Sequence, residues 1–137
     1  MIAADSSVVV AAFASWHELH EPARAIVDRG PRIPAHAALE SYSVLTRLPR
    51  PHRAPPELVL TFLADRFRES FLVLSPESHR QLLGELGSHG IAGAATYDAL
   101  IAAVAREAGA TLVSCDRRAA STYARLQADV EFVGSGA

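Results

Sequence analysis

Four acidic side chains occupy places where a carboxylate is costly to bury unless a cation neutralises it. Asp5 follows a short apolar run near the start of the chain, and Asp116 follows the strongest apolar run near its end. Glu40 and Asp98 lie inside two otherwise apolar helical patterns. Hard divalent ions such as Mg²⁺ and Mn²⁺ take oxygen ligands. The four acids therefore predict a metal-dependent phosphodiesterase centre.

Each acid also has an ordinary structural explanation. Asp5 and Asp116 can each cap a following helix, and Asp98 lies in a first helical turn, where the helix dipole favours an acid. However, Asp98 and Glu40 share helical faces with apolar residues three or four positions away, and such faces are expected to pack on the core. A buried cluster of four unneutralised carboxylates would raise their pKa values, and a metal ion removes that penalty.

Strand-like and helix-like segments alternate along the chain. The expected strands are 2–5, 32–34, 71–74, 111–115 and 130–133; the expected helices are 6–15, 18–29, 37–48, 56–69, 77–86, 97–108 with Thr96 as its cap, and 117–126. Residues 134–137 are expected to be a frayed tail. This order predicts parallel strands joined by right-handed crossovers, with the functional site outside the carboxyl ends of the strands. Asp5 and Asp116 fall at two such ends.

Composition indicates a single globular domain over residues 1–137. Half of the residues are hydrophobic and 20% are charged, which argues against disorder. No apolar stretch approaches the roughly 18 residues that a membrane span needs, and the start of the chain has no signal-peptide pattern. We therefore expect a cytoplasmic protein without a membrane partner. The single cysteine, Cys115, excludes an internal disulfide framework and a cysteine zinc cage.

The net charge of −2 does not exclude a nucleic-acid partner. If the four acids are set aside as metal ligands, 11 of 15 acids remain against 13 bases, which gives +2. Every base is arginine, which binds phosphate in a bidentate way. Arg117 follows a predicted ligand, and Arg47, Arg50 and Arg53 surround a proline-rich connector. They are candidate RNA contacts, and an ordinary solvated surface is the alternative.

The order of these motifs resembles that of PIN domains, specifically VapC-type toxins of bacterial toxin–antitoxin pairs. The opening Met-Ile-Ala-Ala-Asp-Ser-Ser of residues 1–7 resembles the first motif of the family, and residues 34–47 with Glu40 resemble the second. Residues 97–105 and 112–117, which contain Asp98 and Asp116, resemble the third and fourth. No single motif is strong, but the ordered set covers nearly the whole chain.

The resemblance implies a PIN-like α/β/α sandwich with a mainly parallel sheet and an Mg²⁺- or Mn²⁺-dependent endoribonuclease. It also implies a homodimer, inhibition by a cognate VapB-type antitoxin, and products with 5′-phosphate and 3′-hydroxyl ends. The implied catalytic and metal-binding residues are the acidic quartet, supported by two hydroxyls: Asp5, Glu40, Asp98 and Asp116, with Ser6 and Ser114. Two positions depart from the family pattern: Ser114, where Thr is commoner, and Ala119, where an aromatic residue often stands.

Two further predictions concern partners and alternatives. Apolar residues of the helix expected at 56–69 exceed what one side of a sheet needs, which predicts a dimer face or an antitoxin groove: Leu58, Leu60, Phe62, Leu63 and Phe67. The alternative function is a PIN-like module that binds RNA or protein without cutting. A haloacid-dehalogenase phosphatase is disfavoured because Ser7 stands where its second Asp belongs, and a phospho-receiver domain is disfavoured because the chain has no lysine.

Overall fold

A parallel sheet of three strands forms the centre of the fold. The computed structural model describes residues 1–134, so the expected tail beyond Gly134 lies outside the described residues. The strands are β1 (Ile2–Ala4), β2 (Thr111–Ser114) and β3 (Val130–Phe132), in the order β1-β2-β3. Ile2 pairs with Thr111, and Leu112 pairs with Val130. The first and last thirds of the chain therefore meet in the sheet.

Two extended segments continue the sheet beyond β1 only as isolated bridges. Ala3 pairs with Arg32 and Pro34 pairs with Leu72, both in parallel. The strands predicted at 32–34 and 71–74 were therefore too long. Pro34 has no N–H to donate to a ladder, which explains why pairing does not extend. The backbone bond from Leu72 N to Ile33 O, 2.9 Å long, still holds the second segment beside the first.

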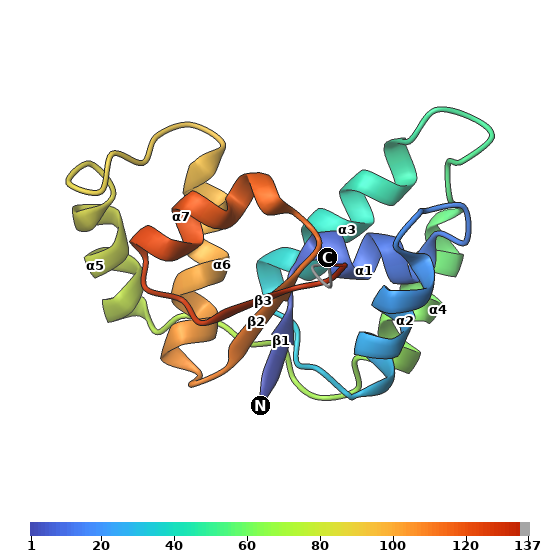
Figure 1. Cartoon of the computed structure of the whole chain (residues 1–137), viewed down its shortest axis with the longest axis horizontal. Coiled ribbons are helices and arrows are strands. Elements are labelled where there is room, and N and C mark those ends of the chain that lie inside the picture. The colour runs from blue at the N-terminus through green and yellow to red at the C-terminus, as the bar shows by residue number, and fades with distance from the viewer. Residues whose placement is uncertain (135–137) are drawn as a thin grey trace.

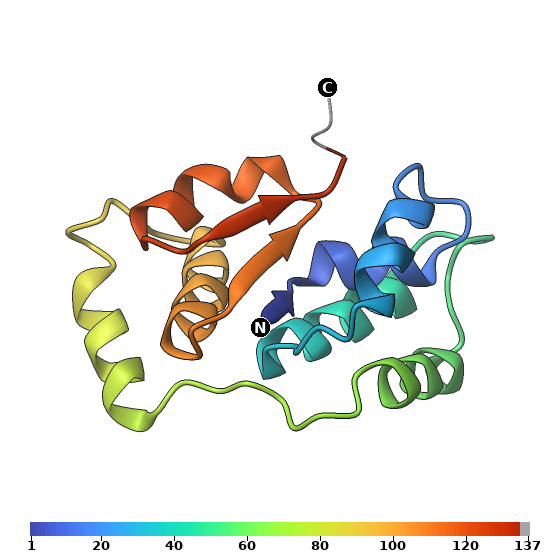
Figure 2. The ribbon, with the colours of Figure 1, turned by 60° about the horizontal axis from the view of Figure 1, so that its bottom comes forward.

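Helices cover the sheet from two sides. They are α1 (Ser6–Phe13), α2 (His20–Asp28), α3 (Ala35–Arg47), α4 (Pro56–Arg66), α5 (Pro76–Glu85), α6 (Ala95–Glu107), a short 3₁₀ turn η1 (Arg117–Ala119) and α7 (Ala120–Arg125). Helices α1–α4 gather on one side of the strands and α5–α7 on the other (Figures 1 and 2). The predicted α/β class, with a parallel sheet flanked by helices, is confirmed. None of the helices within residues 1–134 has the length and apolar character needed to cross a bilayer.

Helix boundaries follow local chemistry. Pro56 and Pro76 start α4 and α5, where a missing N–H costs nothing. Gly109, with φ of +69°, directly follows the C-cap of α6, in the left-handed conformation that favours glycine. The prediction that Thr96 caps this helix is wrong. The helix already begins at Ala95, and its N-cap residue makes no side-chain cap hydrogen bond.

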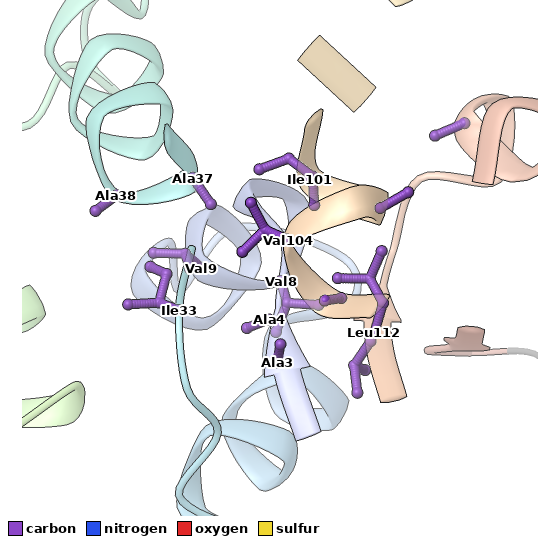
Figure 3. Packing of buried hydrophobic residues seen from close by; sticks show 14 of the residues in the cluster. Ala3, Ala4, Val8, Val9, Ile33, Ala37, Ala38, Ile101, Val104 and Leu112 are labelled. Carbon is purple, nitrogen blue, oxygen red and sulfur yellow. The ribbon is translucent and has the colours of Figure 1, made fainter. Parts of the chain in front are cut away.

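One apolar core fixes the elements that carry the four acids. Val8 and Val9 of α1, Ile101 of α6 and Leu112 of β2 are all buried, and Figure 3 shows their side chains gathered with those of α3. Burial of each such side chain contributes roughly 1.5–3 kcal/mol. Because Asp5, Glu40, Asp98 and Asp116 lie on or directly beside these elements, packing of the core also sets the positions of their backbones.

The apolar surplus predicted for α4 is smaller than expected. Leu63 and Phe67 are buried in the core, and the ring of Phe62 packs edge-on against Phe13 with centroids 5.4 Å apart. Only Leu58 and Leu60 of the predicted set stay exposed, at 55% and 58%. The five residues therefore do not form one continuous docking face.

Candidate active site

Asp5 is the most buried of the four acids, with 2% of its surface exposed. It caps α1: its Oδ1 accepts hydrogen bonds from the backbone N–H groups of Ser7 at 3.0 Å and Val8 at 3.3 Å. Its Oδ2 accepts a 2.7 Å bond from the hydroxyl of Tyr123. Burial raises the pKa of Asp5, while these donors oppose the shift. Asp5 can therefore cap α1 and still take part in the acidic site.

Ser7 links the ends of β1 and β2. Its hydroxyl donates to Asp5 Oδ1 at 2.5 Å and accepts from the backbone N–H of Cys115 at 2.7 Å. The hydroxyl of Ser114 lies 3.4 Å away and accepts from the backbone N–H of Asp116 at 2.9 Å. A chain of hydrogen bonds thus runs from Asp5 to Asp116. Ser114 was predicted to support the site; Ser7 was not, although an Asp-x-Ser turn is a recognisable local motif.

Ser6 connects α1 to α3. Its hydroxyl donates to Oε1 of Glu40 at 2.5 Å, across 34 residues of sequence. Glu40 is half-buried on α3, near the start of α1. Sequence analysis predicted that Ser6 supports the acid cluster, and the structure places its hydroxyl on one member of that cluster.

Asp98 lies in the first turn of α6 and is partly buried. Its pKa is raised to about 6, first by burial and then by the negative charges of Asp116, Glu40 and Asp5. Salt screens such interactions beyond roughly a Debye length, about 10 Å, so the other three carboxylates lie in the same region as Asp98. The side chains that were predicted to converge are brought to the same region.

Asp116 caps the 3₁₀ turn that follows β2. Its Oδ1 accepts from the backbone N–H of Arg118 at 3.0 Å and from the Nε of the same residue at 3.2 Å. The Arg118 side chain is 93% exposed and also lowers the pKa of Asp98 by its charge. Sequence analysis singled out Arg117 here and missed Arg118. The Arg117 guanidinium instead lies over the Phe132 ring, 5.2 Å from its centroid.

The donor set suits a hard cation, but the ligands do not enclose one as they stand. Within residues 1–134, no three His, Cys, Asp or Glu side chains are close enough together to hold a metal ion. Arg118 is bonded to Asp116 and its charge also acts on Asp98, so positive charge near the four acids is limited. Among the described residues, Tyr123 donates to Asp5 Oδ2, and this oxygen keeps a second lone pair for a ligand. The chemistry therefore fits Mg²⁺ or Mn²⁺, and ligation by the quartet stays a prediction.

The remaining predicted RNA contacts lie along α3 and the connector after it. Arg47 is seven residues beyond Glu40 on the same helix, which places it on the same face about 10 Å away. Its Nη1 donates to Ser43 Oγ at 3.2 Å. Arg50 and Arg53 are exposed in the connector. A role in RNA binding stays a prediction for all three.

Replacing Tyr123 by phenylalanine is expected to lower the free energy of unfolding by about 1–3 kcal/mol, because Asp5 Oδ2 loses its donor while remaining buried. Loss of the Tyr123 hydroxyl should also raise the pKa of Asp5 further and weaken activity. Urea unfolding with chelator present measures the stability change. Tyr42→Phe is the matched control, since its hydroxyl makes no hydrogen bond within the described chain. Equal stability of the two variants would contradict the assignment.

Comparison with known proteins decides the family. The family model described as "PIN domain" matches residues 2–125. The chain is 51% identical over 133 residues to Ribonuclease VapC40 of Mycobacterium tuberculosis, strains CDC 1551 and H37Rv, covering 97% of this chain and 99% of the relative.

This chain belongs to the PIN domain family. Ribonuclease VapC27 of M. tuberculosis H37Rv is a second relative, 37% identical over 126 residues that cover 91% of each chain. The prediction of a VapC-type PIN domain of the ribonuclease class is therefore confirmed. A chain in the crystal structure of FitAcB from Neisseria gonorrhoeae has the same fold, with a TM-score of 0.68 over 95% of this chain and 96% of that chain. At 18% identity, that likeness concerns the fold alone.

Proposed function

We propose that this VapC-type PIN domain is an endoribonuclease toxin that uses one or two Mg²⁺ or Mn²⁺ ions held by the acidic quartet. The observation that supports the proposal is that the four acids lie on or beside neighbouring elements around the carboxyl ends of β1 and β2, linked by the Ser6–Glu40 bond and by the Ser7–Ser114 hydroxyl contact. The ribonuclease names of both VapC relatives support the same conclusion. The reaction is hydrolysis of an RNA phosphodiester by water, in the cytoplasm where RNA is found.

The side chains have separate tasks in this mechanism. A bound hard cation would make water more acidic and stabilise negative charge on the phosphate. Tyr123 and Ser7 hold Asp5 in one orientation, so this ligand needs no rearrangement. Glu40, held by Ser6, either completes the ligand set or orients the attacking water. Arg118 places a positive charge beside Asp116, where a substrate phosphate would arrive.

Two protein partners complete the proposal. The proposed partners are a second copy of the chain and a cognate VapB-type antitoxin, whose basic side chain would lie over the acid cluster. An apolar groove between α5 and α6 supports a docking role: its wall includes Leu83, 73% exposed, and Tyr97, 53% exposed. Tyr97 directly precedes Asp98 on α6, so the same helix carries one wall of the groove and one of the four acids. A partner in the groove would cover apolar surface that a monomer leaves in water.

Cleavage of a mixed RNA pool by the purified chain, with sequencing of the new 5′ ends, tests this function. We expect site-limited cuts that carry 5′-phosphates, the ends that the family resemblance implies; water attacks the phosphorus and the 3′-oxygen leaves as a hydroxyl. Light scattering on the same sample should give about 29 kDa, twice the chain mass of 14.6 kDa. A protein that binds RNA with millimolar Mg²⁺ or Mn²⁺ but never cuts it would be the non-cleaving module instead. A mass near one chain would reject the dimer.

A further inference from the structure

An exposed aromatic pair lies on the surface, away from the acid cluster. Trp16, in the loop between α1 and α2, stacks on His52, in the connector between α3 and α4; the ring centroids are 4.3 Å apart and the planes are inclined by 36°. Trp16 is 48% exposed and His52 is also exposed. Neither ring belongs to the hydrophobic core. The contact joins two loops, and Trp16 as a residue stays about half exposed, with the His17 ring as a second neighbour at a centroid distance of 6.0 Å.

Two arginines without ion-pair partners within residues 1–134 lie close to His52 in the sequence. Arg50 and Arg53 flank His52, and neither forms an ion pair within residues 1–134. Arg53 uses its Nε to donate to the Leu48 carbonyl at 2.9 Å, a bond that does not involve its two Nη groups. The acid nearest to Trp16 in sequence is Glu18, which is exposed. Within residues 1–134, the connector therefore carries two arginines without ion-pair partners next to a half-exposed tryptophan.

Some arginines elsewhere on the surface do form ion pairs. Arg29 pairs with Glu131 at 3.3 Å, and Arg66 pairs with Asp28 at 3.1 Å. Arg50 and Arg53 form no such pair, and the same holds for other arginines within residues 1–134, such as Arg68. Surface charge that lacks an internal partner is available for an anionic ligand.

Two helices connect this aromatic pair to the acid cluster. α1 and α3 touch where Ser6 donates to Glu40, and the loops that follow their carboxyl ends meet again at Trp16 and His52. Figure 1 shows both loops on the same side of the molecule, beyond the ends of α1 and α3. From Glu40 to Arg47 the helix rises about 10 Å, the length of roughly three stacked nucleotides. Arg47 lies between the two places.

We propose that Trp16, His52, Arg50 and Arg53 form an outlying subsite for single-stranded RNA. In this proposal, which rests on the ribonuclease function above, a base stacks on the open face of Trp16 and the arginines hold the adjoining phosphates. The stacked base lies several nucleotides from the scissile bond, with Arg47 contacting the backbone between them. Aromatic rings beside basic side chains are the usual means of holding single strands, whereas a protein partner would want a broader apolar surface.

Trp16 is the single tryptophan of the chain, so its fluorescence reports on the subsite directly. The experiment titrates a labelled RNA oligonucleotide into the Asp5→Asn variant with Mg²⁺, and follows polarisation of the label together with tryptophan emission. We expect quenching that follows the binding curve for a long oligonucleotide and is absent with a dinucleotide. Binding seen by polarisation without a change in emission overturns the subsite. Absence of RNA binding overturns it as well.

The same experiment separates this inference from the catalytic proposal, because cleavage by the unmodified chain is measured in parallel. Quenching without any cleavage supports the subsite and rejects the nuclease mechanism. Cleavage without quenching rejects the subsite and leaves the mechanism intact. If the emission responds to the antitoxin but not to RNA, the surface is a protein-docking site and the inference is wrong.

Kinetics of variants provide a second test. Trp16→Ala and the double change Arg50→Ala with Arg53→Ala are each expected to raise KM for long substrates about tenfold, with a much smaller effect on kcat, because the lost interaction is remote from the reacting bond. Phe71→Ala is the matched aromatic control, at 47% exposure. Arg68→Ala is the matched basic control, since its Nε also donates to a backbone carbonyl, that of Asp65. Equal effects in tested and control variants would overturn the subsite.

Discussion

Asp5→Asn is expected to lower kcat/KM for RNA cleavage by about a thousandfold or more, equivalent to ~4 kcal/mol of lost transition-state stabilisation. The side chain is buried at the end of β1 and is oriented by Ser7 and Tyr123, so asparagine takes the same place without the negative charge. Asparagine caps helices as well as aspartate does, so α1 should remain formed. Cleavage of a fluorescent RNA measures the loss.

The same variant should be more stable than the unmodified chain when no divalent ion is present. Burial disfavours the charged form of Asp5, and a neutral amide avoids that cost. We therefore expect a higher Tm in chelator, together with loss of the stabilisation that Mg²⁺ gives the unmodified chain. Gain of stability with loss of activity distinguishes a functional carboxylate from a purely structural cap.

Asp28→Asn is the matched control for this prediction. Asp28 pairs with Arg66 on the surface of α2, and its side chain is 60% exposed. Surface pairs of this kind contribute little to stability, so the variant should differ only slightly from the unmodified chain in activity and Tm. If Asp5→Asn retained a tenth or more of the activity, a role for Asp5 as a metal ligand would be untenable.

Removal of divalent ions is expected to abolish cleavage, and added Mg²⁺ or Mn²⁺ to restore it. The ion should also raise Tm, because it binds only when the carboxylates are gathered by the fold. The restored cleavage and the rise in Tm should both weaken below about pH 6. The pKa of Asp98 is raised to about 6, so at lower pH a proton competes with the ion for this carboxylate.

Without metal, the pH dependence of stability has the opposite sign. Folded Asp98 binds its proton more tightly than the unfolded chain, whose carboxyl has the ordinary pKa of 3.8. Its contribution to stability is fully present below 3.8 and is lost as the pH rises through about 6. Thermal unfolding at several pH values, with Mg²⁺ or with chelator, measures both trends. In the Asp98→Asn variant, the pH dependence of Tm should be weaker both with Mg²⁺ and with chelator. If Mg²⁺ raised the Tm of the unmodified chain equally at about pH 5 and about pH 8, this account would be refuted.

The parts of the site that sequence analysis predicted depend on local patterns. Asp5 and Asp116 follow apolar runs, so the rule that sites lie at the carboxyl ends of parallel strands places them at one edge. Asp98 and Glu40 stand out because an acid interrupts an apolar helical face. These signals lie within a few residues of each acid, and the parallel sheet then brings them together.

The parts that were missed depend on contacts between distant segments. Tyr123 donates to Asp5 across 118 residues, and its own surroundings read as the interior of an ordinary helix. Arg118 lies over Asp116 because the chain turns into η1, which nothing in the composition distinguishes from a regular helix starting at Arg117. The predicted strand at 71–74 failed for the same reason: apolar character alone does not show that Phe71 and Val73 face solvent.

Because β1 pairs with β2, which lies far along the chain, the sheet that carries the acidic site forms only after β2 has been synthesised. Ile2 is made more than a hundred residues before its partner Thr111, and the Tyr123 hydroxyl that orients Asp5 comes later still. A nascent chain therefore carries Asp5 long before the segments that orient it exist. A fragment that ends before Thr111 lacks β2, Asp116 and Tyr123, so we expect no cleavage by such a fragment.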